Sequence, residues 1–140
     1  MTMTAGYRLE DQVGFLIRKV SQRHTSIFAA LMGQDLTPTQ WAALVKIGEY
    51  GTVSQNLLGR ETAMDSATIK GVVDRLKRRE LLKTTHDPSD RRRSMIALTD
   101  LGRRTLDERY ATAERITEET LAGLTDAERQ SLAALLNKMS

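Results

Sequence analysis

Short polar and basic side chains gather between residues 54 and 79, where their types and spacing suit contact with an anionic polymer. Ser66 and Thr68 can form hydrogen bonds with a phosphate or with the edge of a base. Lys70 and Arg75 supply positive charge, and an arginine can bind guanine through two hydrogen bonds. The candidate DNA-contacting residues of this stretch are Ser54, Gln55, Arg60, Asp65, Ser66, Ala67, Thr68, Lys70, Gly71 and Arg75.

Gly71 lies inside this stretch, although glycine costs a helix about 1 kcal/mol relative to alanine. Two reasons would explain it. The residue could allow a close approach to the DNA backbone, or it could allow tight packing against another helix. The sequence leaves both open.

A second basic cluster, Asp90-Arg91-Arg92-Arg93, follows about fifteen residues further along the chain. An arginine at the tip of a hairpin can enter the narrow, electronegative minor groove of DNA. Asp90 fits such a surface if its carboxylate orients a neighbouring arginine through a charge-assisted hydrogen bond. A solvated loop with three arginines is the alternative. The cluster indicates DNA binding only in combination with the stretch 54–79 that precedes it.

The elements that must position these clusters follow from apolar periodicity and from capping residues. Thr37-Pro38, Ser54, Asp65 and Thr125 are helix-start signals. The charged, turn-rich segment 86–93 predicts a hairpin loop. We expect long helices over 9–32, 66–79 and 100–121, and a helix that begins at 38 and ends at 48 or 51. Two further helices are expected, a short one after residue 54 and one after residue 125. Strands are expected over 81–85 and 94–98.

Three helices followed by a β-hairpin form a winged helix-turn-helix, so we expect a mainly α fold with a small β-hairpin wing. The long helices on either side predict a separate dimerisation layer. We expect one domain over residues 1–140, with the winged helix-turn-helix at 36–99 and dimerisation helices at 7–34 and 100–140.

Composition narrows the class of protein. The chain has 140 residues, 40% of them hydrophobic and 28% charged, which is typical of a globular protein. Ten of the basic and six of the acidic residues fall in 60–93, so the net charge of +3 is concentrated in the middle. No apolar run is long enough for a membrane span, and residues 1–6 lack the order of a secretion signal. We therefore expect a cytoplasmic protein.

The sequence offers no set of residues for catalysis. It has no cysteine, which removes thiolate nucleophiles and cysteine-based redox sensing. It has no glycine-rich phosphate loop, and its two histidines, His24 and His86, lie in different expected elements. We expect neither an enzyme, nor a cofactor, nor a metal site.

The chain resembles the MarR family (multiple antibiotic resistance regulators) over nearly its whole length. The resemblance is carried by the stretches 55–60, 64–69 and 72–76, and most specifically by the wing 87–93 with its continuation 98–102. It implies that residues 66–75 lie in the major groove, that Asp90 braces the wing and that Arg92 enters the minor groove. Glu80 and Ala63 depart from it, because glycine is common at both positions. The departure at Glu80 predicts a less abrupt helix end.

The resemblance also implies a two-fold dimer built from the terminal helices, on a pseudopalindromic site. We expect a sequence-specific transcription regulator acting as a ligand-released repressor on double-stranded DNA. An architectural or nonspecific DNA-binding protein is the alternative. Arg60, Lys77, Arg78 and Arg79 are candidates for phosphate contacts.

Similar regulators bind a small molecule between the dimer layer and the winged domain. The segment 18–24 resembles regulators of aromatic-acid catabolism, including the nicotinate type. A cation beside apolar and aromatic residues suits a small aromatic carboxylate, and an aromatic acyl-CoA is also possible. The candidate ligand-binding residues are Arg18, Gln22, Arg23, His24, Trp41, Leu44 and Tyr110. For each of them an ordinary surface or interface role is the alternative.

Overall fold

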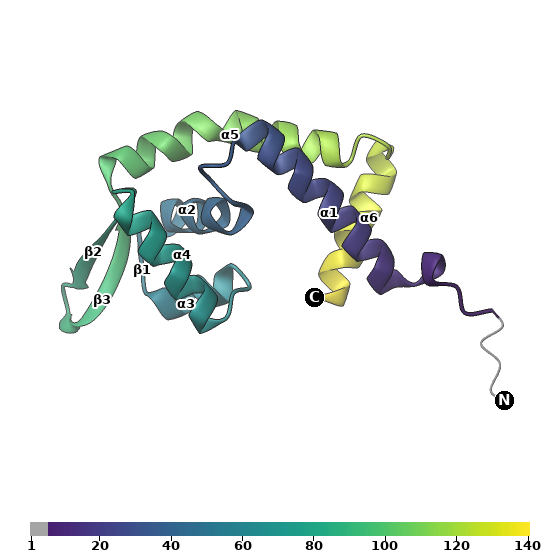
Figure 1. Ribbon diagram of the computed structural model, residues 1–140. Helices are drawn as coiled ribbons and strands as arrows, with labels where there is room; N and C mark the ends of the chain where they lie inside the picture. The colour runs from purple at the N-terminus through teal and green to yellow at the C-terminus, as the bar shows by residue number, and fades with distance from the viewer. Residues whose placement is uncertain (1–5) are drawn as a thin grey trace. The chain divides into compact units, whose positions relative to one another are not determined.

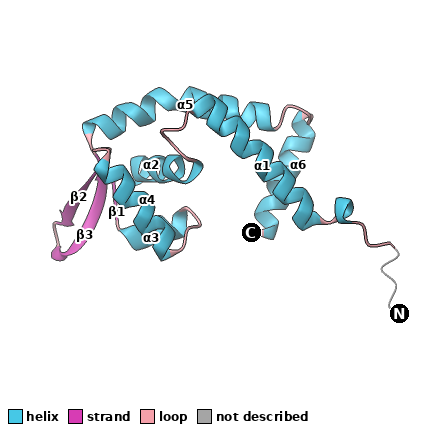
Figure 2. Cartoon of the chain, viewed as in Figure 1, coloured by secondary structure: helices cyan, strands magenta, loops and turns pink. Residues whose placement is uncertain are grey.

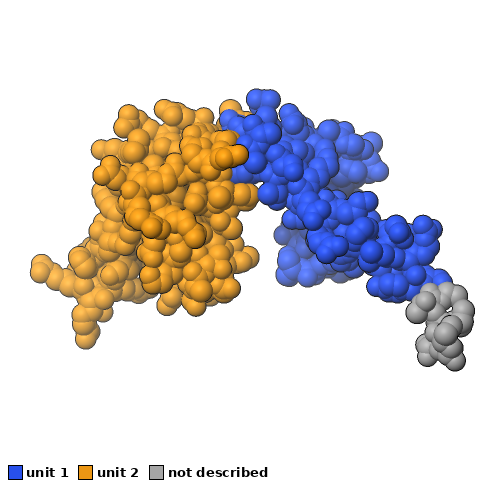
Figure 3. Space-filling view, viewed as in Figure 1, with its two compact units in different colours: residues 1–31, 112–140 blue, residues 32–111 orange. Residues whose placement is uncertain are grey.

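The computed structural model describes residues 6–140, which form two compact units (Figures 1 and 3). Unit 1 contains the chain up to Leu31 together with Thr112–Ser140, and unit 2 contains Met32–Ala111. The prediction that residues 1–6 carry no secretion signal falls mostly on Met1–Ala5, outside the described residues. Within residues 6–140, no helix combines the length and the apolar character that crossing a membrane requires.

Unit 1 consists of helices (Figure 2). It holds the 3-10 turn η1 (Leu9–Asp11), α1 (Val13–Met32), the second half of α5 (Asp100–Thr120) and α6 (Asp126–Met139). The predicted single helix over 9–32 is thus divided, because Gln12 is extended between η1 and α1. Thr125 and Glu128 form the predicted capping box at the start of α6.

Unit 2 carries the helix-turn-helix and the wing. Its elements are α2 (Pro38–Tyr50), β1 (Thr52–Val53), α3 (Gln55–Glu61), α4 (Ser66–Arg78), β2 (Leu82–Asp87) and β3 (Asp90–Leu98), followed by the start of α5. Leu44, Ile47, Leu58, Leu76 and Leu106 are fully buried and come from α2, α3, α4 and α5. This shared core fixes α4 against the rest of the unit. The mainly α fold with a β wing is confirmed.

The wing is a three-stranded antiparallel sheet in the order β1-β3-β2 (Figure 2). Two predictions are corrected here. Strand β1 was missed, because two residues are too few to show alternation. The predicted loop 86–93 was too long, since Asp87 pairs with Asp90 and only Pro88-Ser89 forms the turn. The outer strand residues are polar on both faces, so no apolar pattern marked them.

The end of α4 is abrupt, contrary to what Glu80 suggested. Glu80 adopts a left-handed backbone, with φ +62°. Its N–H bonds Lys77 O at 2.9 Å, and the Leu81 N–H bonds Leu76 O at 3.0 Å. This pair of bonds is the Schellman motif, which usually places glycine at the left-handed position. The chain therefore turns sharply into β2 in spite of the Cβ atom.

The start of α5 is fastened to that turn. The Thr99 hydroxyl accepts a hydrogen bond from Gly102 N at 3.0 Å and donates one to Glu80 O at 2.6 Å. Gly102 lies so close to the Leu81 carbonyl that a Cβ atom would overlap it. The α4–β2 turn and the first turn of α5 thus form one packed corner of unit 2.

Candidate nucleic-acid interface

The helix-turn-helix is built from α3, α4 and the turn Thr62–Asp65. Ser54 caps α3 by accepting Leu57 N–H at 3.2 Å, and Asp65 caps α4 by accepting Thr68 N–H at 2.7 Å. The hydrogen bonds from Thr68 hold the pKa of the Asp65 carboxyl below its usual range. Both predicted caps are present, and they direct the first turn of α4 outward.

The turn itself needs an unusual backbone. Ala63 has φ +55°, the left-handed conformation in which glycine is usual. Thr62 Oγ1 donates to Leu58 O at 2.6 Å, and Met64 N–H bonds Gly59 O at 2.9 Å. These bonds close α3 and keep the angle between α3 and α4 in spite of the alanine.

The two faces of α4 differ sharply. Its inner face buries Ile69, Val72, Val73 and Leu76 in unit 2. Its outer face exposes the predicted residues Ser66, Ala67, Thr68, Lys70 and Arg75. Short side chains at the start of this face leave the helix N-terminus open to a groove, and helix N-termini attract phosphate.

One of the cations on this face is paired within the helix. Lys70 Nζ lies 2.8 Å from Asp74 Oδ2, and this hydrogen bond holds the pKa of Asp74 below its usual range. Arg75 has no ion pair with any residue in the described part of the chain. Arg75 is therefore the freer of the two for an external anion.

Gly71 is not in contact with another helix. A Cβ atom at this position would meet only Arg75 Nη1, at 3.5 Å, which is an ordinary contact. Tight helix packing therefore does not account for the glycine. Gly71 adds no side chain to α4, so the surface of the helix stays low there.

The wing presents its arginines on β3. Asp90 Oδ1 accepts Arg92 N–H at 3.0 Å and lies 3.3 Å from Arg92 Nε. The Arg92 side chain is 93% exposed, so the pair orients the arginine and adds little to stability. Asp87 accepts two hydrogen bonds from Ser89, which hold its pKa low and fix the turn.

A hollow of about 480 Å³ joins the start of α3 to the wing. Arg60 and Arg93 supply positive charge there, and the capping end of α3 supplies polar groups. Such a hollow can accept a phosphate of the DNA backbone. Its lining residues are Ser54, Gln55, Asn56, Arg60, Arg93 and Ser94. The fold thus brings together four predicted residues from segments far apart in sequence.

Two of the lining residues, Asn56 and Ser94, were not among the sequence candidates. Asn56 follows the N-cap Ser54 by two residues, so its place beside a capping signal could have marked it. Ser94 lies on β3 opposite His86, and only the strand register shows that it faces this hollow.

Four of the candidate effector residues lie on α1 in unit 1. Arg18, Gln22 and Arg23 are exposed, and His24 is half-buried. The Arg23 guanidinium donates to Thr120 O at 2.7 Å and to Glu119 O at 2.9 Å. Arg23 therefore binds the free carbonyl groups at the end of α5.

His24 has a defined hydrogen-bonding state. Its Nδ1 atom lies 2.9 Å from Thr120 Oγ1, and that hydroxyl donates its proton to Ile116 O at 2.8 Å. Because the hydroxyl proton is used, the Thr120 oxygen accepts from His24 Nδ1–H. The Nε2 atom of a neutral His24 is then an acceptor, which leaves it ready for a donor from outside the chain.

Arg18 is the other polar group of interest on α1. Its guanidinium carbon lies 5.7 Å from the centre of the Phe15 ring. It makes no ion pair with any residue between 6 and 140. A guanidinium beside an aromatic ring and free of carboxylates suits a planar anion.

The remaining candidates lie in unit 2. Trp41 and Tyr110 stack edge to face with ring centres 5.5 Å apart, and Tyr110 is partly exposed. Leu44 is completely buried, where it packs in the core of the unit.

The surface and the fold first define a class. Unit 2 is a winged helix-turn-helix whose α4 has an exposed polar face and whose wing ends in arginines, as in DNA-binding proteins of this type. The family model described as the MarR family matches residues 36–94. This match, together with a curated relative that is 41% identical over 95% of the chain, establishes that the chain belongs to the MarR family.

Three relatives cover nearly the whole chain. The transcriptional repressor NicR of Pseudomonas putida is 41% identical over 134 residues, 95% of this chain and 85% of NicR. A probable transcriptional regulator from Pseudomonas aeruginosa is 48% identical, with TM-score 0.92, over 95% of this chain and all of that one. Bordetella bronchiseptica BpsR, whose DNA binding is regulated by 6-hydroxynicotinic acid, is 41% identical. Its TM-score is 0.91, and the match covers 95% of this chain and 96% of the BpsR chain. The chain is a DNA-binding transcriptional repressor of this family, and not an enzyme.

Proposed function

We propose that the protein is a homodimeric repressor that binds a pseudopalindromic operator and is released by a hydroxylated aromatic carboxylate. The observation that carries the DNA part is the outer face of α4 together with the wing. Ser66, Thr68 and Arg75 would read the major groove, and Arg92 would enter the adjacent minor groove. The hollow between α3 and the wing would hold a backbone phosphate.

Dimerisation is supported by the surface of unit 1. Large apolar side chains are 42–62% exposed on α1 and α6, more than a monomer usually leaves in contact with water. They are Val13, Leu16, Ile17, Val20, Leu135, Leu136 and Met139. A symmetric pair of subunits would present two α4 helices one turn of DNA apart, about 34 Å.

The effector site that we propose uses α1. Arg18 would bind the carboxylate, and His24 Nε2 would accept a hydrogen bond from a ring hydroxyl or ring N–H group. The two residues are six positions apart, roughly 9 Å along the helix axis and about 120° around it, so their side chains would have to reach one ring from neighbouring faces of α1. The regulation of the relative BpsR by 6-hydroxynicotinic acid supports this class of ligand.

The other candidate residues take supporting roles in the proposal. Arg23 would hold the end of α5 beside His24, while Gln22 would lie at the edge of the site. Trp41 and Tyr110 form an aromatic pair within unit 2, and their contact with the effector stays a prediction. The effector releases the operator only if it binds the DNA-free form more tightly than the DNA-bound form.

Release of a labelled promoter duplex, followed by fluorescence anisotropy, tests the proposal. We expect 6-hydroxynicotinate to release the DNA at lower concentration than nicotinate, which lacks the hydroxyl. Arg18→Gln should weaken the response to both acids roughly tenfold or more, because a charged hydrogen bond is lost. His24→Phe should remove the preference for the hydroxylated acid.

Lys19→Gln is the matched control, because Lys19 Nζ also lies over the Phe15 ring, at 5.6 Å. It should respond like the wild type. A response of Arg18→Gln equal to that of the wild type would contradict the proposed site. If an aromatic acyl-CoA released the DNA and the free acids had no effect, the effector would be an acyl-CoA thioester and not a free carboxylate.

A further inference from the structure

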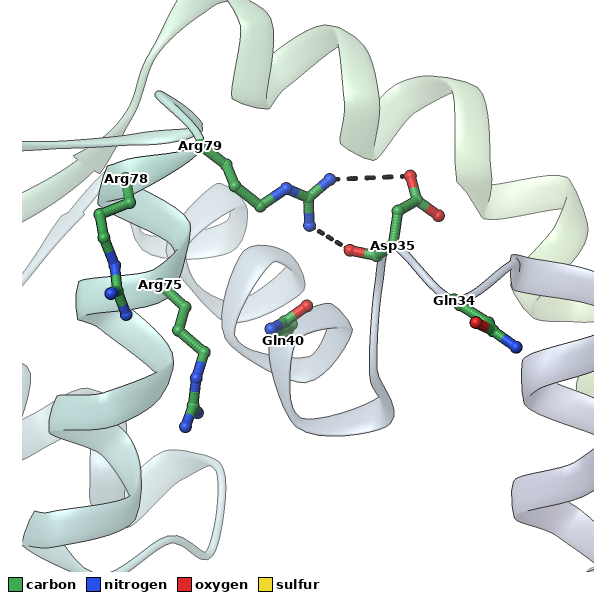
Figure 4. Close-up of a pocket in the computed structure, with 6 residues that line it drawn as sticks. All are labelled: Gln34, Asp35, Gln40, Arg75, Arg78 and Arg79. Atoms are coloured by element: carbon green, nitrogen blue, oxygen red, sulfur yellow. Dashed lines mark hydrogen bonds and ion pairs between the residues drawn. The ribbon is translucent and has the colours of Figure 1, made fainter.

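Side-chain contacts between segments far apart in the sequence hold each unit together. In unit 2, Arg79 at the C-cap of α4 donates to Asp35 in the loop before α2, as Figure 4 shows. In unit 1, Arg23 and His24 on α1 contact the last turn of α5, which ends at Thr120. Because His24 belongs to the proposed effector site, the contacts in unit 1 bear on which effector that site accepts.

The contact between α1 and α5 is a chain of hydrogen bonds that begins at the imidazole ring. His24 Nδ1 lies 2.9 Å from Thr120 Oγ1, and this hydroxyl donates to Ile116 O at 2.8 Å. A hydroxyl has one proton, and the Ile116 carbonyl takes it. Thr120 Oγ1 therefore accepts from the ring, so the Nδ1 atom carries the proton of neutral His24. Hydrogen bonds in such a chain polarise and strengthen one another.

The surroundings of this chain hold its geometry. The Arg23 guanidinium donates from Nη1 to Thr120 O at 2.7 Å and from Nη2 to Glu119 O at 2.9 Å. The last turn of α5 cannot move away from α1 without breaking these two charge-assisted bonds. The His24 ring also lies against Phe28, with ring centres 6.3 Å apart, and both His24 and Thr120 are half-buried. The Thr120 hydroxyl is thus a fixed partner of the ring.

The protonated nitrogen decides what the ring can bind. In a neutral histidine, the hydrogen bond made by one ring nitrogen sets the role of the other. A histidine side chain free in water carries its proton more often on Nε2, so Thr120 reverses the intrinsic preference. Nε2 of neutral His24 is then an acceptor. A ligand group that offers a proton is bound there, whereas a group that offers a lone pair would place two acceptors face to face.

We propose that Thr120 sets the tautomer of His24 and thereby makes the effector site selective for an aromatic acid with a hydrogen-bond donor on its ring. The proposal rests on the proposed function, because it takes His24 as an effector contact. Thr120 is a positioning residue, since it acts through His24 and need not touch the effector. A ring hydroxyl or ring N–H is accepted, and an unprotonated ring nitrogen or an ether oxygen in the same place is not.

The first experiment measures the tautomer without effector or DNA. Multiple-bond ¹H–¹⁵N correlation spectra of the full chain at about pH 8.5, where imidazole is neutral, distinguish Nδ1–H from Nε2–H rings. We expect Nδ1–H in the wild type and in Thr120→Ser, which keeps the hydroxyl. We expect Nε2–H in Thr120→Val, which keeps the shape and removes the acceptor. His86→Gln assigns the signals of the two histidines.

Thr117→Val makes the same change at an exposed position of α5 and is the matched control, which should keep the Nδ1–H tautomer. Circular dichroism checks that all variants are folded. An Nε2–H ring in the wild type, or an Nδ1–H ring that persists in Thr120→Val, would overturn the proposal.

The second experiment measures selectivity by the release of a labelled promoter duplex. We expect 6-hydroxynicotinate to be roughly tenfold more potent than nicotinate for the wild type and for Thr120→Ser, because one hydrogen bond distinguishes the two acids. For Thr120→Val the two acids should become about equally potent, mainly because the response to the hydroxylated acid weakens. A purely structural role of Thr120 would weaken both responses alike and keep their ratio, which would overturn the proposal.

The two experiments separate this proposal from the proposed function. A wild type that responds to the acids, together with a Thr120→Val variant that keeps the preference, would refute the role of Thr120 alone. A wild type that no aromatic acid releases from DNA would refute the proposed effector and with it the selectivity. The NMR measurement would still have decided whether Thr120 sets the tautomer.

Discussion

At the scale of single residues, two positions carry a backbone that glycine adopts more easily. Ala63 lies in the turn between α3 and α4 with φ +55°, and Glu80 follows the C-cap of α4 with φ +62°. In the left-handed region a Cβ atom costs about 1–2 kcal/mol of folding free energy. Replacing the residue with glycine removes this cost but recovers only part of it as stability, because glycine gives the unfolded chain more conformational entropy. Both turns are held by the hydrogen bonds around them.

Glu80→Gly and Ala63→Gly should therefore each stabilise the protein, by up to about 1 kcal/mol in the free energy of unfolding. Urea denaturation of the variants and the wild type checks this. Glu108→Gly changes an exposed position inside α5 and controls for the general effect of introducing glycine. Its free energy of unfolding should fall by about 1 kcal/mol. A loss of stability in both turn variants would contradict the strain that we infer.

The residues that the sequence revealed act on their close neighbours. Thr37, Ser54, Asp65 and Thr125 cap helices three residues away, so their residue types alone predict their contacts. Asp35 could not be found in this way, because its partners Arg79 and Arg109 lie 44 and 74 residues further along. The His24–Thr120 contact was hidden for the same reason.

At the scale of elements, Asp35 links the loop before α2 to α4 and α5. Its hydrogen bond with Arg109, together with the positive charges of Arg109 and Arg79, holds the pKa of the carboxyl below its usual value near 3.9, although burial acts in the opposite direction. A group whose pKa is lower in the folded state stabilises the fold above its unfolded pKa. That contribution is lost as the pH falls through the folded value.

We therefore predict that Asp35→Asn is less stable than the wild type at pH 6–7, and that the difference shrinks as the pH falls below about 4. Urea denaturation across this pH range measures it. Asp107→Asn, which removes a charge from the exposed face of α5, is the control. A difference that stays constant down to pH 3 would show that the ion pairs do not carry the effect.

The corner between α4, β2 and α5 depends on Gly102. Its Cβ position overlaps the Leu81 carbonyl, so Gly102→Ala should destabilise the protein by on the order of 2 kcal/mol. Gly14→Ala is the matched control, because nothing lies within 4 Å of its Cβ position in α1. The free energy of unfolding of the Gly14→Ala variant should rise by up to about 1 kcal/mol. Equal melting temperatures for the two variants would refute the close contact.

The helices of the fold were predictable because each has an apolar face and a capping residue. The wing was predictable in kind but not in length. Its outer strands project from the core, so residues such as His86 and Arg91 alternate with no apolar partner. Strand pairing there depends on register with a distant segment, which sequence pattern does not contain.

At the scale of the whole molecule, reading a pseudopalindromic operator requires two subunits. Ile17 is 47% exposed on α1 within the apolar stripe of unit 1. Ile17→Glu should raise the dimer dissociation constant roughly a hundredfold while leaving the helix content unchanged. Sedimentation equilibrium measures this, with Ser26→Glu on the same helix as control. A wild type that stays monomeric at micromolar concentration would contradict the symmetric arrangement.

The most direct test of the central claim, that α4 and the wing read the operator together, is a competition measurement. Anisotropy compares affinity for the promoter of the neighbouring genes with affinity for unrelated duplex DNA at about 0.15 M salt. We expect a preference of at least about 10³ for the promoter, and a clear loss of that preference in Thr68→Ala and Arg92→Ala. Equal affinity for both duplexes would contradict it and indicate an architectural DNA-binding protein instead.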